Sequence, residues 1–111
     1  LNGELLVEED AYLPMEVGGE RVTISGIVDL VHVTSDSVEI VDYKTNRGRH
    51  AEDEYRKQLS VYYRVAEAVY PDREISASIF YTETDNRRVV EPLTVSELEA
   101  LVEEAEETGE Q

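Results

Sequence analysis

Two short apolar stretches, GIVDL at residues 26–30 and IVDYKT at residues 40–45, each carry one aspartate among strand-forming residues. An unpaired charge buried in a sheet costs several kcal/mol, so Asp29 and Asp42 need a compensating partner. Lys44 follows Asp42 by two residues and supplies one positive charge. A divalent cation would supply more positive charge than the lysine. The two stretches therefore predict a metal-binding site.

The spacing between the stretches predicts which residues face one another. Small polar residues at 34–37 are of the kind that turn a chain. If the middle two form the tip of a hairpin, Asp29 faces Asp42 across the sheet, and Lys44 shares a face with Asp42. Like charges in opposite positions repel, so this register needs a cation or the lysine between them. A three-residue loop would shift the register by one and lose the match.

Length and composition favour one soluble, cytoplasmic domain over residues 1–111. Hydrophobic residues make up 41% of the 111, which is enough for a folded core. No apolar run approaches the roughly 18 residues that span a bilayer, and no leader peptide is evident. The absence of cysteine excludes disulfides, thiolate-bound zinc and an iron–sulfur cluster in this segment. Because the chain begins with Leu1, we expect it to be a fragment of a longer protein.

The chain is strongly acidic, with a formal net charge of −16 and a pI near 4.3. A nucleic-acid-binding protein normally has the opposite sign. Either this protein avoids polyanions, or its acidity is an adaptation to high internal salt, which screens charge repulsion. The acids of the C-terminal segment fall mostly on one face of a predicted helix, which favours a halophilic source. Net charge therefore does not exclude DNA as a substrate.

The pattern of apolar and turn residues predicts an α+β fold with a mixed, mostly antiparallel central sheet flanked by helices. Thr94 and Glu97 have the spacing of a capping box and mark the start of the last helix. The predicted strands cover residues 4–8 and 12–17 (two strands or one interrupted strand), 21–33, 38–44, 75–82 and 87–93, and the predicted helices cover 52–70 and 95–107.

Three motifs in order resemble the nuclease domain of the RecB family. They are Gly26-x-x-Asp29, DYKT at residues 42–45, and Gln58-x-x-x-Tyr62 on the following helix. This family belongs to the PD-(D/E)XK nuclease superfamily, which has the restriction-endonuclease-like fold. The resemblance covers roughly residues 5–82.

The resemblance implies a role for each matched residue. Asp29 and Asp42 would bind Mg²⁺ or Mn²⁺ together with the main-chain carbonyl of Tyr43, and Lys44 would be the catalytic lysine. Gln58 and Tyr62 would help to position the active site and the nucleic acid. Taken alone, Gln58 also fits a solvated helix residue and Tyr62 also fits ordinary core packing.

Further candidates lie on either side of these motifs. The family has an upstream acid that can bind metal, for which Glu9 fits best and Glu8 second. Arg47, Arg49 and His50 form a basic cluster just after Lys44, in a polar loop predicted over residues 45–51, and this cluster either contacts DNA or is simply solvated. Many members also use a histidine on an earlier helix, but no histidine precedes His32 here. Because the chain has no cysteines, the pattern favours a helicase-linked nuclease that lacks an iron–sulfur cluster.

These observations lead to one main hypothesis and two alternatives. The main one is a Mg²⁺- or Mn²⁺-dependent DNA exonuclease in repair or recombination, in which a metal-activated water hydrolyses phosphodiesters at single-stranded DNA ends. It would work with a helicase domain and without a membrane. The first alternative is a catalytically inactive module of the same fold that clamps DNA or docks a protein. The second is an acidic domain that mimics DNA and binds no metal.

Overall fold

The computed structural model describes residues 3–44 and 49–107, and the side chains of residues 3–44 and 54–104. The described residues form five strands and two helices. In chain order these elements are β1 (Glu4–Val17), β2 (Glu20–Val33), β3 (Ser37–Lys44), α1 (Arg49–Val69), β4 (Glu74–Tyr81), β5 (Asn86–Val89) and α2 (Val95–Glu107).

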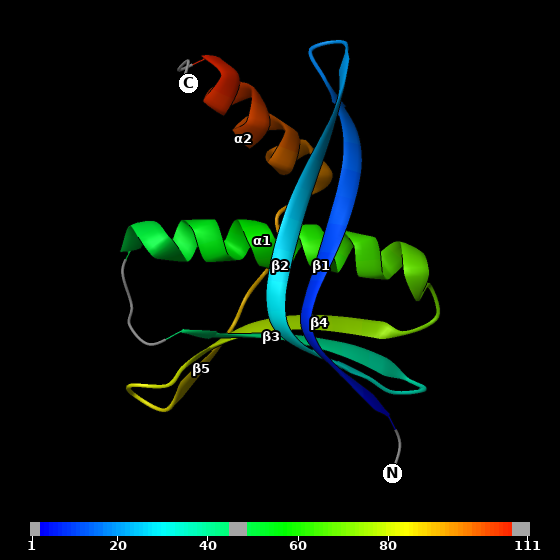
Figure 1. The fold of residues 1–111 in the computed structure, drawn as a ribbon, viewed down its shortest axis with the longest axis vertical. Coiled ribbons are helices and arrows are strands. Elements are labelled where there is room, and N and C mark those ends of the chain that lie inside the picture. Colours follow the sequence, from blue (N-terminus) through cyan, green and yellow to red (C-terminus); the bar gives the residue numbers. More distant parts are fainter. Residues whose placement is uncertain (1–2, 45–48, 108–111) are drawn as a thin grey trace.

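The strands form one mixed sheet in the order β1-β2-β3-β4-β5. Neighbours are antiparallel except for β3 and β4, which are parallel because α1 carries the chain back between them. In Figure 1, α1 crosses the long β1–β2 hairpin, whereas β3 and β4 run across the foot of that hairpin. The predicted α+β fold with a mostly antiparallel sheet is confirmed.

The β2–β3 hairpin has the predicted register. The Thr34 N–H donates to the Ser37 carbonyl at 2.8 Å, which closes the two-residue tip. Val33 then pairs with Val38, and the ladder continues to Leu30 and Val41. One step further, the same register sets Asp29 beside Asp42.

Along β1 and β2, side chains alternate between the two faces of the sheet, and this alternation is reversed at one pair of facing residues. Pairing is continuous on both sides of Glu8 and Asp29, but these two residues are themselves unpaired, and Glu8 has a φ of 54°. Val28 and Val31 lie three residues apart, yet both are fully buried in the same core. Regular alternation would place them on opposite faces. The inversion therefore lets both halves of β2 face α1, and Asp29 lies at the point where it occurs.

Helix α1 packs closely on β2 through Gly26. A Cβ on this glycine would lie 2.5 Å from the Gln58 carbonyl oxygen and 3.0 Å from the Val61 Cβ. Leu59, in the same turns of the helix, is fully buried in the core. Gly26 therefore sets the distance between the helix and the strand, and so the position of the helix residues next to Asp29.

Three boundaries differ from the predicted ones by more than one residue. Helix α1 begins at Arg49 rather than at residue 52, because no helix breaker stands between them. Residues 4–17 form one continuous strand rather than an interrupted one. Strand β5 ends at Val89 rather than at Leu93, because residues 91–93 leave the sheet and bind side chains of α1.

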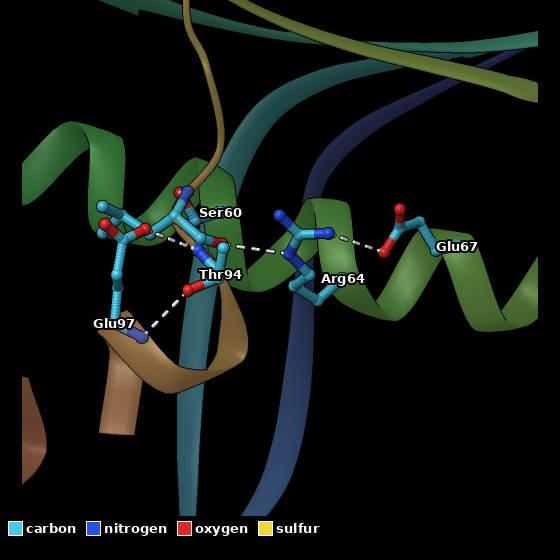
Figure 2. Close-up of polar contacts among 6 residues, drawn as sticks. Ser60, Arg64, Glu67, Thr94 and Glu97 are labelled. Carbon is cyan, nitrogen blue, oxygen red and sulfur yellow. Dashed lines mark hydrogen bonds and ion pairs between the residues drawn. The ribbon is translucent and has the colours of Figure 1, made fainter. Parts of the chain in front are cut away.

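A stripe of polar side chains on α1 holds this segment in place. Arg56 Nε donates to the Glu91 carbonyl at 2.8 Å, and Arg64 Nε donates to the Leu93 carbonyl at 3.0 Å. Between them, Ser60 Oγ accepts the Leu93 N–H at 2.8 Å. Figure 2 shows Ser60 and Arg64 side by side on α1 next to the start of α2. The stripe fixes where α2 begins.

The predicted capping box at the start of α2 is confirmed. The Thr94 N–H donates to Glu97 Oε1 at 2.9 Å, and the Glu97 N–H donates to Thr94 Oγ1 at 3.1 Å (Figure 2). Leu98 is fully buried against Met15, Val17 and Val61. Helix α2 thus covers the end of the β1–β2 hairpin that is remote from β3.

The sheet has one covered face and one open face. A row of cross-strand partners on the open face includes Val7, Val41 and Val89, of which Val7 and Val89 are 65% and 74% exposed. None of the described helices is long and apolar enough to cross a membrane.

We predict that Gly26→Ala lowers the free energy of unfolding by about 1–3 kcal/mol, because the new methyl group meets helix backbone that cannot rotate away. Urea unfolding measures this change. Ser25→Ala, at the exposed neighbouring position, is the matched control and should stay within about 0.5 kcal/mol of the wild type. Equal effects of the two substitutions would contradict the close packing of α1 on β2.

Candidate active site

Asp29 and Asp42 are held together by hydrogen bonds that cross from one strand to the other. The Asp29 N–H donates to Asp42 Oδ1 at 3.2 Å, and the Tyr43 N–H donates to Asp29 Oδ2 at 2.8 Å. Each carboxylate thus accepts a backbone amide of the opposite strand, at the level where the backbone ladder stops. Sequence reasoning placed these two acids next to each other, and the structure does the same.

Burial and the neighbouring acid destabilise the charge of Asp42. Asp42 is only 3% exposed, and its burial is the largest cause that raises its pKa from 3.8 to about 6. A hydrogen bond with Asp29, available to the protonated form, and the charge of Asp29 raise the pKa further, whereas Lys44 lowers it. Two adjacent carboxylates with too little positive charge around them fit a hard divalent cation, which prefers oxygen ligands. Asp29 and Asp42 are the residues that would hold it.

Lys44 projects from the same face of β3 as Asp42. Its Nζ lies 3.2 Å from Asp42 Oδ2. The same ammonium lies 4.3 Å from the centre of the Tyr55 ring, which comes from the first turns of α1. Lys44 therefore has a carboxylate on one side and an aromatic ring on another.

Gln58 and Tyr62 lie one turn apart on α1 but have different surroundings. Gln58 Oε1 accepts the Ile27 N–H at 2.9 Å, so it binds the free edge of β2 two residues before Asp29. Tyr62 is 9% exposed and belongs to the core. Burial, followed by the charge of Glu9, raises the pKa of Tyr62 to about 12. Gln58 thus contacts the strand that carries Asp29, whereas Tyr62 is a neutral core residue beside Glu9.

The remaining proposed metal ligands differ in their placement. The Tyr43 N–H points toward Asp29, and its carbonyl points the same way because both groups of a strand residue face one neighbour. Glu9 lies near Tyr62 instead. Within the described part of the chain, no three His, Cys, Asp or Glu side chains are grouped closely enough to hold a metal. The structure therefore does not bring Glu9 together with Asp29 and Asp42.

The side chains of the proposed DNA-binding cluster lie outside the described part of the structure. Arg47 is not among the described residues, and Arg49 and His50 belong to the first turn of α1, without described side chains. The expectation that all three lie in a loop is wrong for Arg49 and His50, which are helical. Their part in binding DNA stays a prediction.

Sequence reasoning missed Tyr55 as a neighbour of Lys44 and ranked Glu8 only second as the upstream acid. Tyr55 precedes Gln58 by three residues, a spacing that puts both on one helix face, so this signal was available. The ring of Tyr55 lies next to Lys44. Glu8, the second choice for the upstream acid, lies at the level of Asp29 on the neighbouring strand. Its left-handed φ has no sequence signature, because non-glycine residues seldom adopt that conformation.

The chain is similar to known proteins in sequence and in fold. A profile of the PD-(D/E)XK nuclease superfamily matches residues 3–111. The crystal structure of SSO0001 superimposes with a TM-score of 0.64 and 16% sequence identity, and the match covers 96% of this chain and 52% of that one. At this identity the match supports the fold alone, which is restriction-endonuclease-like.

Two relatives have the same name, which describes each of them as one of the subunits of an ATP-dependent helicase/nuclease. The protein from Desulforudis audaxviator is 36% identical over 77 residues, and the one from Anoxybacillus flavithermus is 31% identical over 77 residues. These matches cover 65% and 63% of this chain but only 6% of either relative. The chain therefore corresponds to a small part of these proteins.

We predict that Asp42→Asn changes how stability depends on pH in the absence of metal. The folded protein keeps a proton on Asp42 up to about pH 6, whereas an unfolded aspartate loses it near 3.8. Between these values the folded state binds more protons, so this group lowers the wild-type stability as pH rises, by roughly 1–3 kcal/mol in total. The cost is fully present above about pH 6.

The measurement is urea unfolding of both proteins in EDTA from pH 4 to 8. Relative to the wild type, the Asn variant should gain stability as pH rises through this window, because its side chain stays neutral. Two curves that run parallel throughout would contradict the burial of an unfavourable charge at Asp42.

Proposed function

The chain belongs to the PD-(D/E)XK nuclease superfamily, and on that premise we propose that it is the catalytic core of a Mg²⁺- or Mn²⁺-dependent deoxyribonuclease. The observation that carries this proposal is the pair of adjacent carboxylates on Asp29 and Asp42 with the Lys44 ammonium 3.2 Å from one of them. A bound divalent cation would supply Lewis acidity and lower the pKa of a coordinated water.

The residues of the chain account for the rest of the chemistry. Asp29 and Asp42 place two oxygen ligands at the end of the β2–β3 ladder, with the Tyr43 carbonyl on the same side. The Lys44 ammonium offers N–H donors to a phosphate oxygen and opposes the negative charge that grows during hydrolysis. Gln58 fixes β2 next to Asp29 through the Ile27 amide. Together these residues orient a phosphodiester and stabilise charge on it.

The proposed biological setting follows the relatives' names. Both are described as ATP-dependent helicase/nuclease subunits, which supports a nuclease that works beside a helicase. On this basis we propose that the chain acts in the cytoplasm as an exonuclease at single-stranded DNA ends, in repair or recombination. Digestion of end-labelled strands and of circular single strands, in buffers up to molar KCl for this acidic chain, tests these points.

One observation favours an inactive module that clamps DNA or docks a protein. Only two carboxylates converge within the described part of the chain, and Glu9 does not join them. A nuclease of this family with an incomplete ligand set would still fold, yet would bind metal weakly. The variants below distinguish the two functions.

We predict that Asp42→Ala and Lys44→Ala each reduce DNA cleavage by at least about 100-fold, as removal of one charge-stabilising group does in other hydrolases. Only Asp42→Ala should also abolish the rise in melting temperature on addition of Mn²⁺, because a ligand that binds only the folded state stabilises it. Gel-based cleavage assays and thermal unfolding measure the two effects.

Matched controls come from the same chain. Glu39→Ala removes an acid from the other face of β3, where it pairs with Arg87, and Lys57→Ala removes the one other lysine. Both controls should cleave like the wild type. If Asp42→Ala and Lys44→Ala digest DNA at the wild-type rate in Mg²⁺, the nuclease proposal is wrong.

A further inference from the structure

We propose that Tyr55 is a positioning residue that holds the Lys44 ammonium at the aspartate pair. This inference rests on the proposed nuclease function and adds a residue to that site. Its basis is the 4.3 Å separation between Lys44 Nζ and the centre of the Tyr55 ring, next to the 3.2 Å ion pair with Asp42.

A lysine side chain needs such a constraint to stay in place. Its four-carbon stem is flexible, and one ion pair at the end of β3 leaves the ammonium other rotamers. The face of an aromatic ring carries negative electrostatic potential and attracts a cation within about 6 Å. Tyr55 thus restricts the ammonium from the side of α1, while Asp42 binds it from the side of the strand.

The composition of this chain explains why an aromatic ring suits position 55 better than a second carboxylate would. The protein has 26 acidic and 10 basic residues, so a free ammonium meets competing carboxylates in many directions. A second carboxylate at position 55 would hold Lys44 but would add negative charge beside Asp29 and Asp42. A neutral ring attracts the ammonium without that added charge, so the N–H groups left free can reach a phosphate oxygen.

The fold keeps the ring in position independently of the lysine. Tyr55 is partly buried and packs against the hydrophobic core between α1 and the sheet. It lies three residues before Gln58, whose side chain is fixed to the Ile27 amide. The same helix therefore anchors β2 at one point and presents the ring to β3 at another.

The kinetic test compares Tyr55→Phe with Tyr55→Leu. The Phe variant keeps the ring face and should retain kcat within about twofold, whereas the Leu variant keeps apolar bulk but no ring and should lose about 5- to 30-fold in kcat. KM and the Mn²⁺-induced rise in melting temperature should stay at wild-type values in both. Tyr63→Leu is the matched control, because it removes a ring 5.1 Å from Arg64 on the same helix.

A second readout does not depend on activity. The chain contains only two lysines, Lys44 and Lys57, so lysine-selective NMR gives two sets of side-chain signals. The Lys44 methylene protons next to the ammonium should show an upfield ring-current shift in the wild type and in Tyr55→Phe, and lose it in Tyr55→Leu. Lys57, which pairs with Glu54, is the internal reference.

The outcomes separate this inference from the function on which it rests. An absent ring-current shift overturns the contact whatever the activity. A shift that disappears in Tyr55→Leu while kcat stays at the Phe value overturns the positioning role, and so does an equal loss of kcat in Tyr55→Phe or in Tyr63→Leu. If the wild type does not cleave DNA at all, the nuclease proposal and the kinetic role fail together, and NMR alone decides whether Tyr55 holds Lys44.

Discussion

The site depends on an exchange of hydrogen bonds between two strands in which aspartate oxygens accept the amides. Asp42 accepts the amide of Asp29, and Asp29 accepts the amide of Tyr43. A regular ladder would use carbonyl oxygens here, and the carboxylates could then project anywhere. Because the acids themselves join the strands, their separation is fixed by the backbone. The inversion of alternation at Asp29 makes this possible, since the β1–β2 pairing is interrupted and the β2–β3 pairing ends at the same level.

The burial of Asp42 lowers the stability of the protein when this residue is charged, although the proposed chemistry needs that charge. The raised pKa of Asp42 indicates that the folded protein opposes the charged form of a residue that would have to be charged to bind the proposed cation. Lys44 offsets only part of that cost. The surrounding structure compensates through close packing, in which Gly26 lets α1 approach β2 and the stripe of Arg56, Ser60 and Arg64 fixes the start of α2.

Local features of the fold could be predicted from the sequence, whereas features that depend on tertiary contacts could not. The turn at 34–37 gave the β2–β3 register, and the Thr94–Glu97 spacing gave the start of α2, because each depends on residues close in sequence. The end of β5 depends on hydrogen bonds from a helix about 30 residues away.

In the candidate site, too, local features could be predicted and tertiary contacts could not. Asp29, Asp42 and Lys44 come together because one hairpin register fixes them, whereas the contact between Lys44 and Tyr55 requires the packing of α1 on the sheet. Glu9 fitted the pattern of an upstream acid, but the inversion at Glu8 directs it toward Tyr62.

We propose that Asp29 and Asp42 would hold one divalent cation together, and the most direct test of this claim is an anomalous diffraction map from crystals grown with Mn²⁺. A single strong peak within about 2.5 Å of an oxygen of both Asp29 and Asp42 is the predicted result. A Mn²⁺ ion bound only among other carboxylates, or one that touches only one of the two aspartates, would contradict the claim.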